Sequence, residues 1–351
     1  MRTQRKLTTP MQLEQSTLPP KSGKPHVVIL GAGASRAACP NGDKYGRKLP
    51  LMNDLIDALG LEPALNRLRV DCSDRDFERI YAELTACGEL NDVVADIERA
   101  VFDYFFRLYL PEEPTVYDHL VLSLRRKDLI ATFNWDRLLW QALCRNAKRF
   151  GDDAVPQALY LHGSVAIGYC NDHMPRTIGS RGSLCNRCGA MLTPSRLLYP
   201  VTQKNYAKDP SIADSWEEMQ RFLKHAYLFT VFGYRAPATD VEAIRLMKEA
   251  WGDPDSRHLE EIQIIDIRGK DESGRDELYQ GWEPLICRDH YGVGTTFYQS
   301  LAALHPRRSC EHFWEAAMQN NPQLERPIPA HADWDELATW IEPLLQQERN
   351  T

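Results

Sequence analysis

Two short runs near the middle of the chain hold residue types that bind a transition metal. Cys170 and His173 are separated by two residues, as are Cys185 and Cys188, and eleven residues lie between the pairs. Such spacing brings both side chains of each pair to one ion, and three thiolates with one imidazole form the closed tetrahedral set of a structural zinc site. The alternative is an accidental Cys-x-x-Cys redox pair, which the nearby second pair disfavours. We therefore predict one structural zinc ion.

Other candidate residues follow short apolar runs. Asn134 and Asp136 come after the run at 128–132, and His162 comes after the run at 158–161. Polar side chains at the carboxyl ends of parallel strands lie where open α/β sheets bind ligands, and histidine titrates near neutrality, as an acid or base must. Two simpler interpretations stay open: Asn134 or Asp136 caps the following helix, and His162 is structural.

A glycine turn follows the first apolar run. Residues 27–30 are Val-Val-Ile-Leu, which is typical of a strand buried on both faces of a parallel sheet. Gly31 and Gly33 then permit a sharp turn in which backbone N–H groups approach an anion, most often a phosphate. Arg36 stands where the dinucleotide fingerprint has a third glycine. The alternative is a tight turn that only packs.

The elements that must position these residues are short strands and many helices. Helical patterns fill residues 51–125 as an insertion between the first two strands, and another follows at 137–148. Further helices are expected from 240 to 251 and at 294–304, 309–319 and 334–346, and residues 36–50 are expected to form a loop. Strands are expected at 27–30, 128–132, 158–161, 227–232, 262–267 and 284–287. This alternation predicts an α/β fold with a parallel sheet.

Composition narrows the functional classes. The chain has 351 residues, 43% of them hydrophobic, and a formal net charge of -7, which disfavours a dedicated nucleic-acid binder. No apolar stretch is long enough for a membrane span. Residues 1–25 are polar and basic with four prolines, so they are expected to form a flexible arm and not a secretory signal. The scattered cysteines predict reduced thiols and a cytoplasmic location.

Taken in order, these motifs resemble the Sir2 (sirtuin) superfamily, and especially the divergent Sir2-like domains of bacterial antiphage defence proteins. The resemblance covers residues 26–290: the glycine turn at 31–35, Thr-Phe-Asn-Trp-Asp at 132–136, His-Gly at 162–163, the metal motif, and Gly-Tyr-Arg at 233–235. It implies a Rossmann-like parallel sheet flanked by helices, with a small helical and zinc-binding module and NAD⁺ bound between them. The implied domain spans 26–304, with the helical insertion at about 51–125, the zinc module at about 168–192, and a C-terminal helical extension at 305–351.

The resemblance also implies roles for individual residues. Asn134 would address the ribose and the reacting centre, Asp136 would lie near the nicotinamide, and His162 would be the general base. The residues expected to contact NAD⁺ elsewhere are Gly31, Ala32, Gly33 and Ser35 at the pyrophosphate, Gly233 and Arg235 at the adenosine half, and Asp266 at the adenine end.

Two departures from the family affect the expected reaction. Residues 36–44 lack the Gly-Ile-Pro-Asp-Phe-Arg run of the protein deacylases, and residues 199–206 do not match the strand that pairs with an acetyl-lysine peptide. The expected function is therefore NAD⁺ hydrolysis to ADP-ribose and nicotinamide by a defence effector. A protein deacylase and a non-catalytic NAD⁺- or ADP-ribose-binding subunit are the alternatives. Expected partners are further copies of the chain and a separate protein such as an ATPase, without a membrane or direct nucleic-acid binding.

Overall fold

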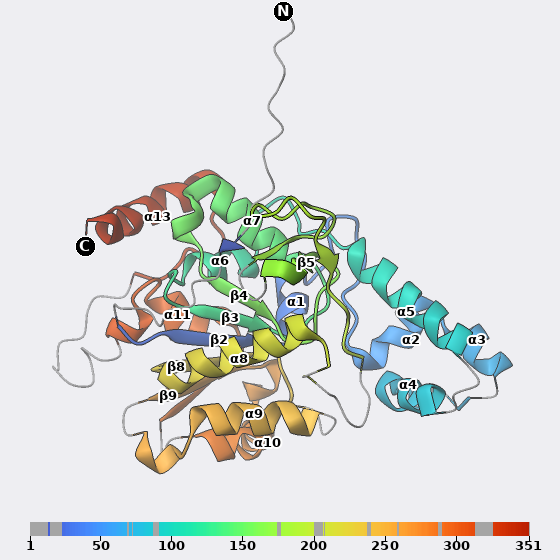
Figure 1. Ribbon diagram of the computed structural model, residues 1–351. Coiled ribbons are helices and arrows are strands. Elements are labelled where there is room, and N and C mark those ends of the chain that lie inside the picture. Colours follow the sequence, from blue (N-terminus) through green and yellow to red (C-terminus); the bar gives the residue numbers. More distant parts are fainter. Residues whose placement is uncertain are drawn as a thin grey trace, which may run out of the picture.

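A six-stranded sheet forms the centre of the computed structural model (Figure 1). The structure describes residues 13–14, 23–68, 70–71, 73–86, 91–173, 177–199, 206, 208–236, 240–257, 260–286, 290–312 and 326–350. The strands of this sheet are β2 (His26–Leu30), β3 (Leu129–Thr132), β4 (Gln157–Tyr160), β8 (Leu228–Phe232), β9 (Glu261–Ile265) and β10 (Tyr291–Gly294).

All neighbouring strands of this sheet are parallel, in the order β10-β9-β8-β2-β3-β4. Counted along the chain, this is the strand order of the doubly wound Rossmann fold, in which β2 is the first strand and β8 the fourth. The direction of winding reverses between these two strands, and ligands of such sheets bind outside their carboxyl ends at that point. The predicted α/β, Rossmann-like class is confirmed.

Helices cover both faces of the sheet because the strand side chains alternate in direction. Val28 and Leu30 belong to one buried cluster, and Val27 and Ile29 belong to the other. The first face packs against α1 (Ala32–Ala38), α6 (Val116–Leu122), α7 (Leu138–Phe150), α11 (Leu301–Leu304) and α13 (Trp334–Arg349). The second packs against α8 (Pro210–His225), α9 (Val241–Trp251) and α10 (Glu272–Trp282).

The helical insertion has a hydrophobic cluster of its own. It consists of α2 (Leu55–Leu59), α3 (Glu62–Arg67), α4 (Phe77–Ala86) and α5 (Asn91–Phe106), and it projects to the right of the sheet in Figure 1. Phe77, Ile80 and Val101 are buried within it. Trp135, which follows β3, belongs to the same cluster, so the insertion packs beside the end of that strand.

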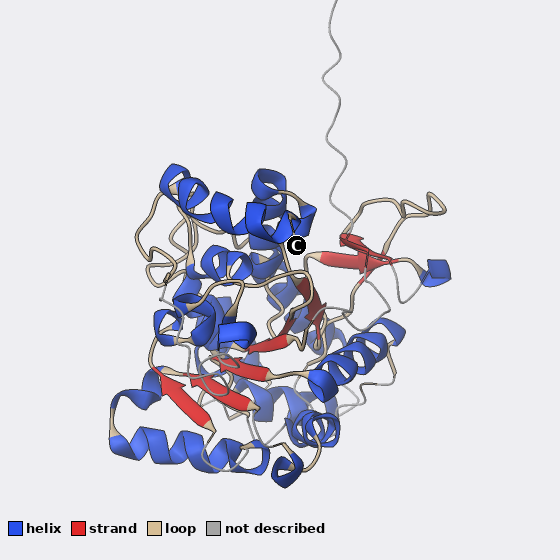
Figure 2. Cartoon of the chain, turned by 90° about the vertical axis from the view of Figure 1, so that its left-hand side faces the viewer, coloured by secondary structure: helices blue, strands red, loops and turns tan. Residues whose placement is uncertain are grey.

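The predicted metal ligands lie in the connections of a second, antiparallel sheet. This sheet is drawn in Figure 2. Its order is β1-β6-β5-β7, formed by β1 (Leu13–Glu14), β5 (Ile167–Tyr169), β6 (Thr177–Ser180) and β7 (Thr193–Pro194). Leu13–Glu14, from the segment expected to be a flexible arm, pairs with β6.

Several expected elements differ in the structure. The loop expected at 36–50 begins three residues too early, because α1 starts directly after Gly31 and continues to Ala38. The strand expected at 284–287 is wrong: Glu283–Leu285 is a 3-10 helix, and Pro284 has no N–H for a sheet hydrogen bond. The last strand is β10, in a region expected to be partly helical, and α8 and α10 had not been predicted. The predictions at 313–319 and 200–205 lie outside the described residues.

Short 3-10 helices complete the described elements. They are Met52–Asp54, Asp152–Ala154, Asn171–His173, Pro254–Ser256, Ile267–Lys270, Glu283–Leu285 and Phe297–Gln299. Within the described ranges, no helix combines the length and the apolar character needed to cross a membrane.

A buried arginine joins the C-terminal helix to the sheet domain. The Arg307 guanidinium donates hydrogen bonds to the backbone oxygens of Leu124 (2.9 Å) and Ala154 (2.8 Å). Its Nε and Nη2 donate to the Glu348 carboxylate of α13 at 2.6 and 2.7 Å. The Arg307 side chain is only 1% exposed, so water has little access to the backbone oxygens that it bonds and could not easily replace it as a donor.

We predict that Arg307→Met lowers the free energy of unfolding by about 3 kcal/mol, because it removes the donor to buried carbonyl oxygens and the ion pair with Glu348. Urea denaturation followed by circular dichroism measures the loss. The control is Arg349→Met, which removes an ion pair with Asp153 in which both side chains are about half exposed, and which should cost at most about 1 kcal/mol. Equal losses of unfolding free energy in the two variants would show that Arg307 does not hold α13 against the sheet domain.

Candidate functional site

Two glycine turns meet at the carboxyl ends of β2 and β8. Gly31 N–H donates to Phe232 O and Gly33 N–H donates to Gly233 O, both at 3.0 Å. A Cβ at Gly31 would lie 2.5 Å from Gly233 O, and one at Gly233, where φ is +64°, would lie 2.3 Å from the nitrogen of Ala34. The glycines are thus required for backbone packing, and the Gly33 N–H is occupied by this contact. Gly33 thus has a packing role in this turn, while Ala32 and Ser35 line an adjoining cavity.

Ser35 and Asp136 are hydrogen-bonded beside this turn. The Ser35 hydroxyl donates to Asp136 Oδ2 at 2.6 Å, and the Leu138 N–H donates to Asp136 Oδ1 at 2.8 Å. The second bond pairs the N–H of the first residue of α7, so Asp136 supports the start of that helix in addition to contacting Ser35, although Arg137 occupies the N-cap position. Burial raises the pKa of the Asp136 carboxyl, while its bonds to Ser35 and Leu138 act in the opposite direction.

Asn134 does not cap α7. Its Nδ2 donates to Gly31 O at 2.8 Å and lies 2.9 Å from Ser35 Oγ. The side-chain amide therefore links the end of β3 to the turn after β2, across 103 residues of sequence. With Nδ2 directed at the turn, Oδ1 is the amide atom that is available to a ligand.

A small cavity lies beside these polar groups. It has a volume of about 60 Å³, and its polar lining comes from Ser35, Asn134 and Asp136. The rest of the lining includes Leu51, Met52 and Leu55 of the helical insertion, with Phe105 and Trp135. The space could hold a few water molecules, but it is smaller than the roughly 300–1,000 Å³ of ligand pockets.

His162 lies in an aromatic cluster next to this cavity and does not line it. Its ring meets Phe133 edge-on at 4.7 Å between centroids, and its Nε2 is 3.1 Å from the Tyr206 hydroxyl. Phe133 also stacks on Tyr234 at 4.2 Å and lines the cavity. Phe133 thus contacts His162 and also lines the cavity beside Ser35, Asn134 and Asp136, a relation that no sequence pattern indicated.

The two remaining NAD⁺-contact candidates lie outside this group. Arg235 is exposed. Residues 237–239 fall outside the described chain, and they include Thr239, a predicted cap of α9. Asp240 occupies the N-cap position of that helix. At the end of β9, Asp266 Oδ1 accepts the Nε–H of Arg268 and Oδ2 accepts its Nη2–H, both at 3.0 Å. The Asp266 carboxylate is therefore already paired with a neighbouring guanidinium.

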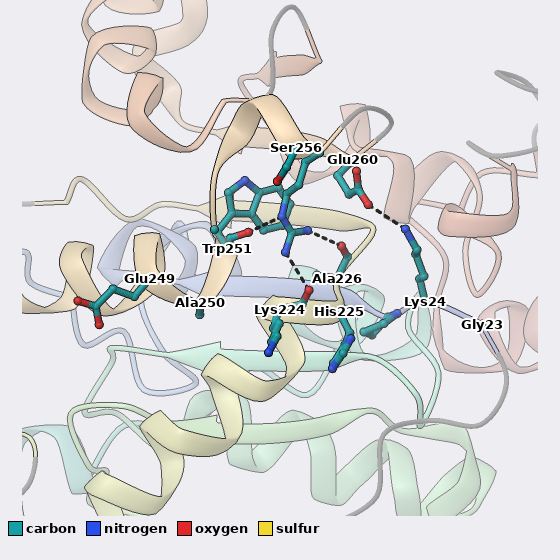
Figure 3. Close-up of a pocket in the computed structure, with 13 residues that line it drawn as sticks. Gly23, Lys24, Lys224, His225, Ala226, Glu249, Ala250, Trp251, Ser256 and Glu260 are labelled. Carbon is teal, nitrogen blue, oxygen red and sulfur yellow. Dashed lines mark hydrogen bonds and ion pairs between the residues drawn. The ribbon is translucent and has the colours of Figure 1, made fainter.

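A second cavity lies at the opposite edge of the sheet (Figure 3). It has a volume of about 740 Å³, and Lys24, Ala226 and Glu260, which precede β2, β8 and β9, are among its lining residues. Lys24 is paired with Glu260 at 2.8 Å. Arg257 donates hydrogen bonds to the backbone oxygens of Ala226 and Trp251, at the C-terminal ends of α8 and α9. Since ligands of doubly wound sheets bind at the other edge, this cavity is not the candidate site.

The four predicted zinc ligands converge on one point. Cys170 Sγ lies 3.4 Å from His173 Nδ1 and 3.6 Å from Cys188 Sγ, while Cys185 Sγ lies 3.7 Å from His173 Nδ1. All four donor atoms lie within 4.8 Å of one another. Tetrahedral bonds of about 2.3 Å to sulfur and 2.0–2.1 Å to nitrogen place such donors roughly 3.5–3.8 Å apart, so the cluster fits zinc.

We predict that the purified protein contains one zinc ion per chain and that Cys185→Ser lowers both the zinc content and the melting temperature, because a structural zinc contributes folding free energy. Elemental analysis and thermal denaturation measure these quantities. Cys144→Ser, which changes a half-buried thiol outside the cluster, should keep the zinc. Fresh protein without zinc would contradict the prediction.

Comparison with known proteins finds similarity only among solved structures. No protein-family model matches the chain, and no curated protein matches its sequence. A structure described as a Sir2 homologue mutant in complex with ADP-ribose shares 16% identity, with a TM-score of 0.39 over 85% of this chain and 94% of that one. A second, concerned with the mechanism and regulation of Sir2 enzymes, shares 16% identity, with a TM-score of 0.37 over 93% and 94%. A third, Sir2 with a peptide and NAD⁺, shares 14% identity, with a TM-score of 0.32 over 84% and 93%.

Proposed function

We propose that this protein is an NAD⁺ glycohydrolase that cleaves the nicotinamide–ribose bond. The observation that carries the proposal is the meeting of Ser35, Asn134 and Asp136 beside the glycine turns, at the point where the winding of a Rossmann-ordered sheet reverses. That edge is where doubly wound sheets bind dinucleotides. The order of the sequence motifs, which resembles the Sir2 superfamily, supports the same substrate.

The reaction needs few chemical groups. Nicotinamide leaves with the electron pair of its bond to ribose C1′, positive charge develops on the sugar, and water adds to C1′ and loses a proton to give ADP-ribose. Asn134 Oδ1 would orient the ribose hydroxyl or the water, and the Asp136 carboxyl, held by Ser35, would lie near the nicotinamide. His162 is the candidate acceptor of the proton.

Water is favoured over an acyl-lysine as the nucleophile. The cavity beside Asn134 is of the size of a few water molecules and is enclosed by apolar side chains of the helical insertion. Most of the segment that would pair with a peptide, residues 199–206, lies outside the described chain, so the sequence departures are what favour hydrolysis.

The same cavity supports a regulated enzyme. NAD⁺ does not fit in about 60 Å³, so Leu51, Met52 and Leu55 must move away from Asn134 before the substrate can bind. We propose a cytoplasmic defence effector whose site opens on self-assembly or on binding of a partner such as an ATPase. In this proposal the zinc ion is structural and takes no part in the reaction.

The reaction is tested by incubating the protein with NAD⁺, with and without an acetylated peptide, and measuring nicotinamide by chromatography. The expected result is release without peptide, accompanied by ADP-ribose. Release only with peptide would indicate a deacylase, and NAD⁺ binding without release would indicate a non-catalytic subunit; either result contradicts the proposal.

We predict that Asn134→Ala and His162→Ala each lower the rate of NAD⁺ cleavage by about 10²- to 10⁴-fold, the usual cost of losing a positioning group or a general base. Thermal denaturation checks that the variants remain folded. Asn171→Ala, which alters an exposed side chain bonded to Thr193, is the control and should keep the wild-type rate. If Asn134→Ala melts earlier but cleaves NAD⁺ normally, Asn134 is structural; if only His162→Ala stays active, water needs no base from this residue.

A further inference from the structure

Tyr117 is a buried tyrosine whose hydroxyl reaches the candidate site from behind. It is the second residue of α6 and is 0% exposed. Its hydroxyl lies 2.7 Å from Ser35 Oγ and 3.2 Å from Asn134 Nδ2. Tyr117 does not line the cavity, so it reaches that space only through these two residues.

The direction of these hydrogen bonds follows from counting protons. The Ser35 hydroxyl has one proton, which it donates to Asp136 Oδ2. The Tyr117 O–H must therefore be the donor to Ser35 Oγ. Burial and the nearby Asp136 carboxyl raise the pKa of Tyr117 well above its ordinary value, so this proton stays in place at neutral pH. The result is a directed chain from Tyr117 to Ser35 to Asp136.

Asn134 is held by the same chain. Its Nδ2 donates one proton to Gly31 O, and the other is directed at the oxygens of Ser35 and Tyr117. Removing the tyrosine hydroxyl would free the Ser35 side chain to turn and would leave the second amide proton of Asn134 with one acceptor in place of two. The orientation of Oδ1 toward the cavity would then be less fixed.

The helix that carries Tyr117 is itself held rigidly. Asp118 is fully buried, and its Oδ2 accepts the N–H and the hydroxyl of Thr115, both at 2.7 Å. Arg145 and Asn146 of α7 donate to Asp118 Oδ1 at 2.6 and 2.8 Å. This ion pair and its hydrogen bonds join α6 to α7, so the position of the tyrosine hydroxyl is set by two helices.

We propose that Tyr117 is a positioning residue: its hydroxyl fixes the Ser35 hydroxyl and the Asn134 amide, so that Asn134 Oδ1 meets the reacting ribose in one orientation. This inference rests on the proposed NAD⁺ hydrolysis and deepens it. Tyr117 does not touch the substrate; it acts through its two neighbours.

The test compares Tyr117→Phe with Tyr160→Phe. Both tyrosines are fully buried in the same cluster, but no described group hydrogen-bonds the Tyr160 hydroxyl, so the second variant removes an equivalent atom without altering the chain. We expect Tyr117→Phe to lower kcat for nicotinamide release by about 10- to 100-fold with little change in KM, since a displacement of about 1 Å costs a rate of that size. Tyr160→Phe should keep the wild-type kcat.

A double mutant separates action through Asn134 from an independent effect. In the Asn134→Ala background, Tyr117→Phe should change kcat by less than about twofold, because the group that it positions is already absent. A wild-type kcat in Tyr117→Phe, an equal loss in Tyr160→Phe, or the full additional loss in the Asn134→Ala background would each overturn the inference.

A second readout does not depend on turnover. In protein with ¹⁵N-labelled asparagine, the Asn134 side-chain amide signal is identified by its disappearance in Asn134→Ala. Its hydrogen exchange should be at least about tenfold faster in Tyr117→Phe and unchanged in Tyr160→Phe, because one acceptor is lost only in the former. Wild-type protein that binds NAD⁺ but releases no nicotinamide would refute the proposed function, whereas unchanged exchange in Tyr117→Phe would refute the positioning role.

Discussion

The backbone contact between the turns after β2 and β8 is the constraint on which the candidate site depends. At Gly31, Gly33 and Gly233 a Cβ would lie 2.5, 2.8 and 2.3 Å from backbone atoms of the opposite turn. Only glycine permits this approach, which lets Gly33 N–H bond Gly233 O and joins the two strands between which the winding of the sheet reverses. The start of α1, and with it Ser35, is fixed by this contact.

From that contact, a buried polar network extends to β3 and α6. Asp136 and Ser35 are at most 5% exposed, and Tyr117 is fully buried, so each of their polar atoms needs a protein partner to offset the loss of water. The hydrogen bonds among them supply those partners and give each hydroxyl one direction. Networks of this kind define a single arrangement of side chains, which is what a site that positions a substrate requires.

The two accessory modules act on different parts of the molecule. The four clustered cysteine and histidine residues lie beside a small antiparallel sheet, where the local hydrophobic cluster has three residues among those described, so a zinc ion bound there would add to the stability of this sheet. The helical insertion has a core of its own and places Leu51, Met52 and Leu55 over the polar network. Movement of this insertion would change access to the site without altering the network beneath it.

The sequence by itself determined the features that depend on local pattern. Five of the six parallel strands, the glycine turns, the polar residues at the ends of β2 and β3 and the cluster of three cysteines and one histidine could be predicted. Strand periodicity, turn chemistry and ligand spacing involve neighbours along the chain. The resemblance of the motifs to a known superfamily added the expected topology and the substrate.

The tertiary structure decided which of these residues act together. From the sequence alone, Tyr117 would be interpreted as a core residue of an apolar helix. Only the packing of α6 on α1 brings its hydroxyl to Ser35, 82 residues away in sequence. His162 and Asp266 follow strand ends, as predicted. His162, however, contacts the rings of Phe133 and Tyr206, and Asp266 forms an ion pair with Arg268. The strand β10 was missed because Gly292 and Gly294 lower the β-propensity of its four residues, and its pairing with β9 supplies the stability that the glycines do not. Contacts between distant segments are set by the packing of whole elements, which no local pattern records.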